Sequence, residues 1–365
     1  MAFNRLPSGS RILVTGEFHS SCNCIILLTL CSLPGATGLA GSAITDLLLQ
    51  RGFRVRGVGR SAAKAAPFAD HLNTKYGAGA FEFAEVADYT ISGAFDSVLQ
   101  GVTGVVHVAT EASFDVLSDV DTALVVSTAA VLGLMKAAAG IESVKSFVLT
   151  SSSVTVMATA IEYGKDVQLS TETWQDHAIA LAQSLPSDIP AKGFMGYVAS
   201  KIVGEREAWK FWNEEKPGYA FNSVLPDMIL GPVLNPVKGT YTTHSWMNDV
   251  FLGNRDALSV AFMNPPEWMV DSRDTAIIHV AALLSTEMNG QRLWAAAHPH
   301  TLNQHLALWR KAFPDRNILP DFDFPAPPKI DLTDLDKSTK LLKEFAGKDW
   351  YTFEETSLAN VAHAL

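Results

Sequence analysis

Cysteine is scarce in this sequence, and all of it lies in one short segment. The 365 residues contain 3 cysteines, at positions 22, 24 and 31. Their spacing, with His19 as the only nearby addition, does not supply the four ligands of a closed zinc site. We therefore expect no metal site in this protein.

Long apolar runs and basic clusters are also missing. The most apolar stretch, residues 25–33, is much shorter than the roughly 20 residues that span a membrane. A plausible strand precedes it, so it does not read as an export signal. The net charge of -10 and the absence of any Lys/Arg run argue against nucleic acid or an anionic membrane as a partner. With 48% hydrophobic and 18% charged residues, the sequence predicts a globular, cytoplasmic protein.

A glycine-rich phosphate motif is present, but in two pieces. Residues 11–16 read as a strand that ends in Thr15-Gly16, and Ala36-Thr-Gly-Leu-Ala-Gly41 opens an amphipathic helix. Without residues 17–35, the strand, a G-x-x-G-x-x-G turn and the helix would be continuous. Such a turn lets the backbone approach a pyrophosphate, which the N–H groups of the helix N-terminus attract. Gly35, Gly38 and Gly41 keep the same spacing in the chain as it stands.

The segment 17–35 has two interpretations. Its 19 residues correspond to 57 nucleotides, so their removal keeps the reading frame and restores a single glycine. The codons of residues 16–18 can contain the splice donor GTGAGT, and those of residues 34–35 can end an intron in AG. We interpret the segment as a retained intron. The alternative is a genuine loop insertion, which would cost the fold only about 2 kcal/mol in loop-closure entropy.

Strand and helix patterns alternate along the chain. Strands are expected at 11–15, 54–58, 81–86, 105–108, 147–150 and 221–225, helices at 61–76, 94–100 and 121–139, and mostly loop over 154–196. The alternation predicts an α/β fold with a doubly wound parallel Rossmann sheet. After Pro226 the chain is richer in Pro, Trp and Met. We expect one domain over 9–365, with a core of about 11–225 and a small C-terminal substrate lobe of about 226–365.

The segment Tyr197-Val-Ala-Ser-Lys201 is the strongest candidate for chemistry. Residues i and i+4 share one helix face, so the phenol and the ammonium can line one cleft. A nearby cation lowers a phenol pKa that is otherwise about 10. Upstream, the strand pattern Phe147-Val-Leu-Thr150 runs out into three serines, at the sheet edge where open α/β folds bind ligands. Together with the glycine motif, this combination predicts a nicotinamide-dependent oxidoreductase.

The end of the second strand bears on the choice of cofactor. It reads Gly57-Val-Gly-Arg60-Ser61, with Lys64 one turn later and no acid. An acid there would bind the adenosine ribose of NAD, whereas a base accommodates the 2′-phosphate of NADP, and the planar fork of Arg suits phosphate. NADP(H) is therefore favoured. The alternative is that Arg60 and Lys64 form an ordinary solvated helix start.

These motifs resemble the extended short-chain dehydrogenase/reductase family, which belongs with the NAD-dependent epimerases and dehydratases. Within it they are most similar to yeast and fungal NADPH-dependent aldehyde reductases and methylglyoxal reductases, neighbours of plant dihydroflavonol reductase. The resemblance covers nearly the whole chain apart from the insertion. It rests on Val14-Thr-Gly16 joined to Ala36-Thr-Gly38, on residues 55–61, 107–109, 147–152, 197–201 and 222–226, on Gly231-Pro232, and on Val270-Asp-Ser-Arg-Asp274.

The resemblance implies a Ser-Tyr-Lys catalytic set. Ser152 would hold the carbonyl oxygen, Tyr197 would deliver the proton, and Lys201 would bind the nicotinamide ribose and lower the tyrosine pKa. Ser151 and Ser153 are the rivals; Ser152 is favoured as the second serine after Thr150. The implied cofactor contacts, some of which could equally be packing residues, are Thr15, Gly16, Gly35, Ala36, Thr37, Gly38, Leu39 and Ala40 at the pyrophosphate turn, Arg60 and Lys64, Asp88 and Tyr89 by the adenine, Ala109 and Thr110 along the ribose, and Pro226 and Ile229 toward the nicotinamide.

Two departures from the family pattern stand out. Many members use an Asn on the helix before the serine strand to hold a proton-relay water, but this chain has no Asn between Asn73 and Asn213. Asp227 stands where relatives often have Asn or an apolar residue. The resemblance therefore leaves the relay and the local cofactor contacts open.

The expected activity is NADPH-dependent reduction of an aldehyde or ketone to an alcohol, by a monomer or homodimer. Two alternatives are an NAD-dependent sugar-nucleotide epimerase or dehydratase and a non-catalytic dinucleotide sensor. The presence of Tyr197 and Lys201 counts against the sensor. An apolar C-terminal lobe counts against a nucleotide-sugar site and suits a small hydrophobic carbonyl substrate. The apolar residues of this lobe are Trp246, Met247, Phe262 and Trp268. Four residues are candidates for the pocket lining, with core packing as the alternative, since aromatic residues at such places are more often part of the core: Phe114, Met157, Phe194 and Trp246.

Overall fold

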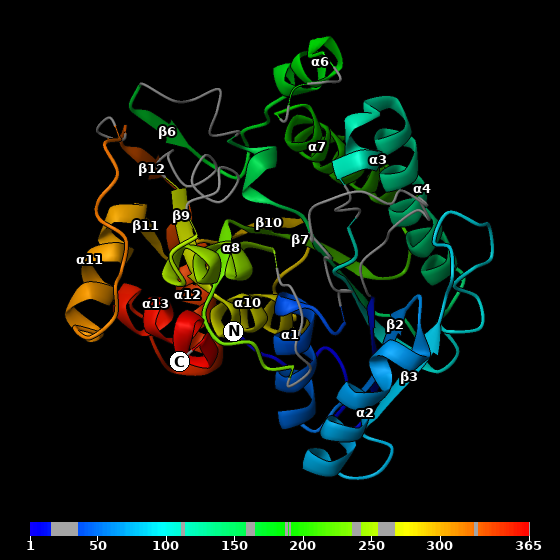
Figure 1. Cartoon of the computed structure of the whole chain (residues 1–365). Coiled ribbons are helices and arrows are strands. Elements are labelled where there is room, and N and C mark those ends of the chain that lie inside the picture. Colours follow the sequence, from blue (N-terminus) through cyan, green and yellow to red (C-terminus); the bar gives the residue numbers. More distant parts are fainter. Residues whose placement is uncertain are drawn as a thin grey trace.

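A parallel sheet of seven strands forms the centre of the fold (Figure 1). The computed structural model describes residues 1–15, 36–110, 114–157, 165–186, 189, 191–235, 242–254, 267–324 and 328–364. Across the sheet the strands run in the order β10 (Gln291–Ala295), β7 (Ala220–Pro226), β5 (Ser146–Thr150), β4 (Val102–His107), β1 (Arg11–Thr15), β2 (Arg54–Gly59) and β3 (Phe81–Glu85). Every neighbouring pair is parallel, which confirms the predicted doubly wound Rossmann sheet.

The strand order defines where the sheet can bind a ligand. From β1 the chain builds outward through β2 to β3, and it then returns to β4 on the other side of β1. In an open α/β sheet, ligands bind outside the carboxyl ends of the strands at such a reversal. Thr15, His107 and Thr150 end β1, β4 and β5 at this edge. The candidate catalytic and cofactor residues follow these strand ends.

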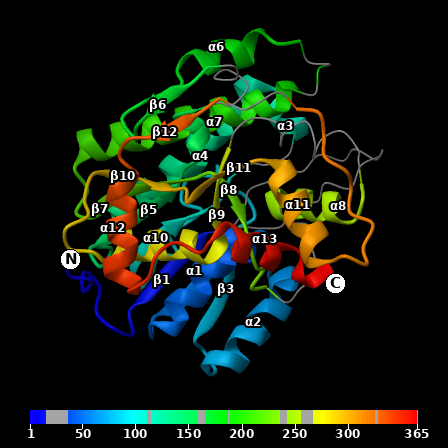
Figure 2. The same ribbon diagram turned by 90° about the vertical axis from the view of Figure 1, so that its left-hand side faces the viewer.

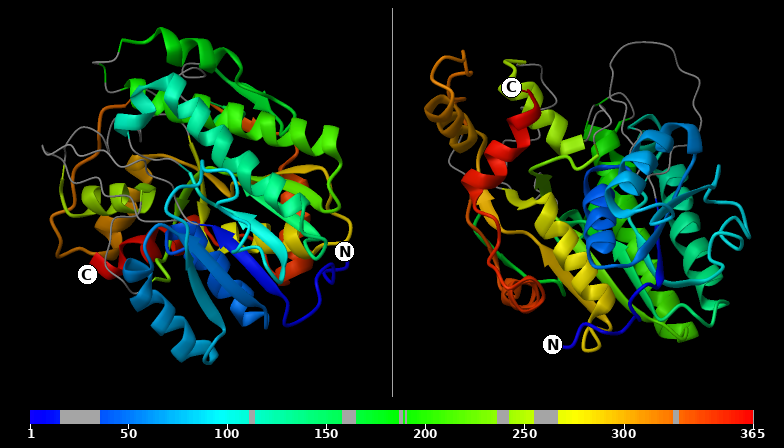
Figure 3. Two further views of the ribbon diagram at one scale, coloured as in Figure 1. Left: turned by 90° about the vertical axis from the view of Figure 1, so that its right-hand side faces the viewer. Right: turned by 90° about the horizontal axis from the view of Figure 1, so that it is seen from below.

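Helices cover both faces of the sheet (Figure 3). On one face lie α1 (Leu39–Gln50), α2 (Ala62–Tyr76), α10 (Ser272–Leu284) and α12 (Leu335–Ala346), and on the other lie α4 (Val120–Ala139) and α7 (Ala191–Glu215). Nearly every residue of α10 is buried, because this helix packs between α1, α12 and the sheet. Among the described helices only α4 is long and apolar enough to cross a membrane, and here it packs along α7.

A second sheet and three helices form a lobe with its own apolar core. The strands β8 (Met228–Leu230), β9 (Glu267–Asp271) and β11 (His298–His300) make this sheet. The helices α8 (Thr242–Phe251), α11 (Leu302–Ala312) and α13 (Phe353–Val361) gather beside it (Figure 2). Phe251, Leu306 and Trp309 are buried in this core. The remaining elements are α3 (Phe114–Ser118), η1 (Ser153–Thr155), β6 (Val167–Leu169) paired with β12 (Ile330–Leu332), α6 (His177–Ser184) and η2 (Ala362–Ala364).

Three expectations about local structure are corrected. Residues 94–100, expected to be helical, form successive turns between Gly93 and Gly101, which both have positive φ. Residues 154–196, expected to be mostly loop, include β6, α6 and the start of α7, because Ala178 and Ala182 bury one face of α6 against α7. After Pro226 the chain re-enters the main sheet through α10 and β10, so residues 226–365 do not form a separate lobe. Strand β10 was not predicted from the sequence, because its first two residues, Gln291 and Arg292, are polar.

The domain also begins earlier than expected. Leu6 is buried in the main core, and Arg5 donates to the backbone oxygens of Ser285 and Met288. Residues before position 9 are therefore part of the folded unit. The insertion at 17–35 and Gly16 lie outside the described residues.

Candidate active site

Tyr197 and Lys201 lie one turn apart on α7, as the sequence predicted. The Lys201 Nζ atom is 6.0 Å from the centroid of the Tyr197 ring. It donates to the backbone oxygen of Thr150 (3.1 Å) and to the hydroxyl of Thr110, so the ammonium lies at the carboxyl ends of β4 and β5. A cation in this position favours the charged form of a neighbouring phenol. The helix spacing and the positions of the strand ends thus bring together three of the predicted site residues, Thr110, Tyr197 and Lys201.

A glycine beside Tyr197 allows α7 to touch α3. A Cβ atom on Gly196 would overlap the backbone carbonyl of Leu117 on α3. Because that neighbour is backbone rather than a flexible side chain, any larger residue would have to move one of the two helices. Sequence reasoning missed Gly196, since a glycine within a helix gives no sign of what approaches it.

The three serines after β5 have different partners. The Ser151 hydroxyl donates to Glu205 Oε2 (2.6 Å), and the Ser153 hydroxyl bonds to the carboxylate of Asp227. Ser152 Oγ has one long contact, from the backbone N–H of Val154 (3.4 Å). The two rival serines therefore hold neighbouring elements in place, and Ser152 is the one without a strong side-chain partner among the described residues.

A buried ion pair, Glu205 with Arg292, holds the turn that contains the three serines. Glu205, one turn beyond Lys201 on α7, accepts hydrogen bonds from Ser151 and Ser223 and from Arg292 Nε (2.9 Å). Burial alone would raise the pKa of Glu205, but the charge and hydrogen bonds of Arg292 outweigh it, so the pKa is lowered. The Arg292 guanidinium also stacks 3.8 Å from the ring centroid of Trp174. Sequence reasoning missed this pair, whose only signals are an acid at i+4 from Lys201 and an Arg in β10.

A small cavity lies between Lys201 and this ion pair. It has a volume of about 30 Å³, and its lining includes Ser127, Ser151, Lys201 and Glu205. A cavity of this size with several polar groups can hold a water molecule. Ser127 belongs to α4, the helix before the serine strand, on which the family's relay Asn was sought. Helix α4 thus contributes the Ser127 side chain to the lining of this cavity.

Thr15 and His107 tie β1 to β4. Their side chains are 2.7 Å apart (Oγ1 to Nδ1), and Thr15 Oγ1 also accepts the N–H groups of Val108 (3.1 Å) and Ala109 (3.3 Å). Burial, together with the charge of Lys201, lowers the pKa of His107 to about 3. The imidazole is therefore neutral near pH 7, and the Thr15 hydroxyl braces the strand ends.

The pyrophosphate turn leads into α1 without a side-chain cap. Gly38 is the N-cap residue, no side chain caps the helix, and its first turn contains no acid. A helix start of this kind suits an anion. Ala36, Thr37, Leu39 and Ala40 are buried here, and the Asn235 amide donates to the Thr37 backbone oxygen (2.8 Å) from the segment after β8. Sequence reasoning missed Asn235, and Gly16 and Gly35 lie outside the described residues.

The residues predicted for the adenine end of the cofactor differ in their surroundings. Arg60 follows β2 directly, and Lys64 is exposed in the first turn of α2. The carboxylate of Asp88 accepts the N–H (2.8 Å) and hydroxyl (2.6 Å) of Thr90 and so closes a tight turn. Tyr89 is fully buried, with its ring 5.1 Å from that of Phe95. The ring of Tyr89 therefore serves packing, and only its backbone remains as a cofactor contact.

The segment after β7 is held from several sides. Pro226 ends β7, and the carboxylate of Asp227 accepts the N–H of Trp268 (3.1 Å). Burial raises the pKa of Asp227 to about 7, against the opposing effect of its hydrogen bonds. The backbone oxygen of Ile229 accepts the Thr243 hydroxyl (2.6 Å). Ile229 is thereby tied to α8 of the second lobe.

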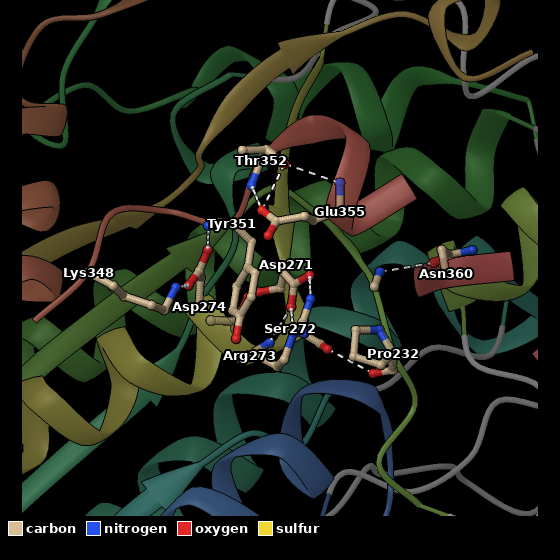
Figure 4. Close-up of polar contacts among 12 residues, drawn as sticks. Pro232, Asp271, Ser272, Arg273, Asp274, Lys348, Tyr351, Thr352, Glu355 and Asn360 are labelled. Carbon is tan, nitrogen blue, oxygen red and sulfur yellow. Dashed lines mark hydrogen bonds and ion pairs between the residues drawn. The ribbon is translucent and has the colours of Figure 1, made fainter. Parts of the chain in front are cut away.

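Gly231 is joined to the C-terminal segment through Asn360, and Figure 4 shows Lys348 and Tyr351 of that segment against Asp274. Gly231 has a φ of +99°, and a Cβ there would approach Asp271 Oδ2 to 2.7 Å, so only glycine fits. Its N–H donates to Asn360 on α13 (3.1 Å). Asp274 binds the ammonium of Lys348 and the N–H of Tyr351. The segment Val270-Asp-Ser-Arg-Asp274, which contributed to the family resemblance, therefore anchors the C-terminal chain.

The apolar residues predicted for the pocket divide into two groups. The rings of Phe194 and Tyr197 lie 6.4 Å apart, so Phe194 does border the candidate catalytic group. Met157 is buried in an apolar core with Trp294, and Trp246 packs against the core of the second lobe. The side chain of Phe114 and all of Phe262 lie outside the described residues.

Residues 32–244, which are more than half of the chain, match the NAD dependent epimerase/dehydratase family. The chain belongs to this family. The match begins inside the insertion, so it includes Gly35-Ala-Thr-Gly38 and omits the strand before them.

Relatives within the family cover almost the whole chain. Aldehyde reductase 2 of Sporidiobolus salmonicolor is 32% identical over 96% of this chain and 95% of its own. The ketoreductase adrE of Penicillium rubens is 32% identical over 97% and 96%. The crystal structure of yeast methylglyoxal/isovaleraldehyde reductase Gre2, complexed with NADPH, is 24% identical over 96% and 97%, with a TM-score of 0.75. The resemblance read from the motifs is confirmed.

Proposed function

We propose that this protein is an NADP(H)-dependent reductase of aldehydes or ketones, with Ser152, Tyr197 and Lys201 as its catalytic set. The observation that carries the proposal is the position of the Lys201 ammonium, bonded at the ends of β4 and β5 and one turn from Tyr197. The relatives named aldehyde reductase and ketoreductase support the same class of reaction.

The chain's own residues fit a dinucleotide along the carboxyl edge of the sheet. The start of α1, which no side chain caps, would bind the pyrophosphate. Arg60 and Lys64 would bind the 2′-phosphate, and Lys201 with Thr110 the nicotinamide ribose. The residues left for backbone or packing contacts are Thr15, Ala36, Thr37, Leu39, Ala40, Asp88, Tyr89, Ala109, Pro226 and Ile229. The cofactor, when bound, supplies a hydride to the carbonyl carbon of the substrate.

Tyr197 would donate its proton to the carbonyl oxygen while Ser152 holds that oxygen. The partners of Ser151 and Ser153 support Ser152 for this role, since Glu205 and Asp227 engage the rivals. Lys201 would stabilise the phenolate that remains. A positioned acid of this kind is typically worth about 10²–10⁴-fold in rate.

A water in the cavity beside Lys201 would return the proton. The cavity borders the hydroxyl of Ser127 on one side and Lys201 on the other, so Ser127 would take the part that an Asn plays in many relatives.

The substrate would be a small, hydrophobic carbonyl compound that lies against Phe194. A sugar-nucleotide epimerase activity is the second candidate, since the family includes such enzymes. The apolar core of the second lobe favours the smaller substrate. We also propose a cytoplasmic monomer or homodimer with no nucleic acid or membrane partner, because the chain has a net charge of -10 and no basic cluster.

The test is NADPH consumption over a panel of aldehydes and ketones, together with product analysis after incubation with nucleotide sugars and NAD. Purified proteins with and without residues 17–35 are compared, because we propose that this segment is a retained intron that masks the pyrophosphate turn. We expect turnover of apolar aldehydes or ketones, and tighter NADPH binding in the shorter protein. Epimerisation of a nucleotide sugar without carbonyl reduction would overturn the proposal.

Transcript sequencing tests the origin of the insertion separately. We expect a dominant message that lacks the 57 nucleotides. A dominant full-length message, with equal NADPH affinity of the two proteins, would make the segment a tolerated loop.

A further inference from the structure

The N-terminus of α2 carries a carboxylate that comes from a different strand. Glu85, the last residue of β3, accepts the backbone N–H of Ala62 through Oε2 (2.9 Å). Ala62 is the first residue of α2, and Ser61 caps the same turn through the N–H of Lys64 (3.3 Å). The helix start is therefore shared by one serine hydroxyl and one negative charge.

The sheet register explains why Glu85 reaches this position. Strands β2 and β3 are parallel, and Gly59 pairs with Glu85, so both strands end at the same level. Arg60 follows Gly59 directly. The sequence places no acid at the end of β2, but the neighbouring strand supplies one from 25 residues further along the chain.

This position coincides with the region in which a 2′-phosphate would bind. In doubly wound folds the group after the second strand faces the adenosine ribose, and a helix N-terminus attracts a phosphate. Arg60 and Lys64 favour a phosphate there, whereas the carboxylate of Glu85 repels one and already occupies an N–H of the helix. The same carboxylate can accept a hydrogen bond from a free ribose 2′-hydroxyl.

We propose that Glu85 is a specificity-determining residue that weakens the binding of the 2′-phosphate and so narrows the preference for NADPH over NADH. The inference rests on the proposed dinucleotide-dependent function. It predicts an enzyme that accepts both cofactors, with Arg60 and Glu85 acting in opposite directions.

The expected size of the effect follows from exposure. Glu85 is solvent-exposed, so water and salt screen its repulsion of a phosphate that carries about −1.5 to −2 charges. Charges a few ångströms apart in water interact by about one tenfold factor in affinity or less. We therefore expect a change of about three- to tenfold rather than a switch of cofactor.

The test uses binding, so that it does not depend on turnover. Glu85→Gln keeps an oxygen that can accept the Ala62 N–H and removes only the charge. Glu142→Gln is the matched control, because it makes the same change in net charge at an exposed residue of the loop between α4 and β5. Calorimetry measures 2′,5′-ADP and AMP as fragments with and without the 2′-phosphate, at low and high salt.

We expect Glu85→Gln to bind 2′,5′-ADP about three- to tenfold more tightly, and AMP with less than a twofold change. The gain should shrink at high salt, and the ratio of kcat/KM for NADPH to that for NADH should rise by a similar factor. An unchanged affinity for 2′,5′-ADP, or the same change in Glu142→Gln, would overturn the inference. Should the protein reduce no carbonyl while Glu85→Gln still shifts 2′,5′-ADP, the proposed reaction fails and the role of Glu85 stands.

Discussion

The proposed catalytic end and the proposed cofactor end of the sheet edge are built differently. At the catalytic end, the serine turn after β5 is fixed by side chains from α7, β7 and β10, which meet at the buried Glu205–Arg292 pair. At the proposed cofactor end, α1 begins without a side-chain cap, and the Asn235 amide donates to the Thr37 backbone oxygen. Groups that must hold a reacting atom are preorganised by a buried network. The start of α1 instead leaves backbone N–H groups that no side chain caps, which suits an anion.

Tyr197→Phe should produce the largest effect on activity. It removes the proposed general acid and keeps the ring against Phe194, so turnover should fall by roughly 10²-fold or more. The melting temperature and NADPH affinity should stay close to those of the parent protein. Near-parental turnover would remove Tyr197 from the mechanism.

The catalytic pair was predictable from sequence because its geometry is local. Tyr197 and Lys201 are four residues apart on one helix, and helix periodicity alone places them on one face. Two of the strands also followed from local pattern, since β1 and β5 consist mostly of apolar residues. Residue spacing alone did not distinguish Ser152 from Ser151 and Ser153. The resemblance to known reductases favoured Ser152.

The supporting residues could not be predicted, because they depend on long-range register. Arg292 is 87 residues from Glu205, and Glu85 reaches α2 only through the pairing of β3 with β2. Both positions look like ordinary surface charges in the sequence. Strand β10 was missed as well, because its first two residues are polar. Only the burial of its guanidinium explains an arginine at position 292 of this strand.

Arg292→Met tests the catalytic network through stability. The substitution leaves the Glu205 carboxylate buried without its counter-ion, which should cost about 3–5 kcal/mol of unfolding free energy. The control is Arg206→Met, which breaks an exposed pair with Asp176 and should cost about 0–1 kcal/mol. Urea denaturation measures both. Equal losses in the two variants would mean that the buried pair does not support the fold.

Acid should loosen the strand ends through two buried histidines. His107 contacts Thr15 at the end of β1, and His279 of α10 contacts Thr150 at the end of β5, with 2.8 Å between His279 Nε2 and Thr150 Oγ1. Burial lowers the pKa of His107 to about 3 and that of His279 to about 4. Both values lie below the unfolded value of about 6.5, so their contribution to stability is complete above pH 6.5 and is lost as the pH falls toward 4. Each should remove about 1.4 kcal/mol per pH unit in this window. His279→Gln should flatten the measured pH dependence, and an unchanged slope would contradict the assignment.

Arg60→Ala tests the cofactor end. Loss of a charged hydrogen bond to the 2′-phosphate should weaken NADPH by about 1.5–3 kcal/mol and leave NADH nearly unaffected. Arg54→Ala is the control, because Arg54 is an exposed arginine at the opposite end of the same strand. Fluorescence titration with both cofactors gives the four affinities. A loss of the same size for NADH would mean that Arg60 supports the fold rather than the phosphate.

Asn235→Ala should have the smallest effect and is the most direct test of the comparison. It removes the hydrogen bond from the Asn235 amide to the Thr37 backbone oxygen. Loss of a hydrogen bond of this kind costs about 1 kcal/mol and, by loosening the proposed pyrophosphate turn, should raise the KM for NADPH by about two- to fivefold with little change in kcat. Asn303→Ala is the matched control, because Asn303 also donates to a backbone oxygen (Phe322, 2.9 Å) but lies in the second lobe. That variant should lose similar stability without a change in KM. If Asn235→Ala lowered kcat as strongly as it raised KM, the two ends of the site would be coupled through the turn, and the cofactor end would be as preorganised as the catalytic one.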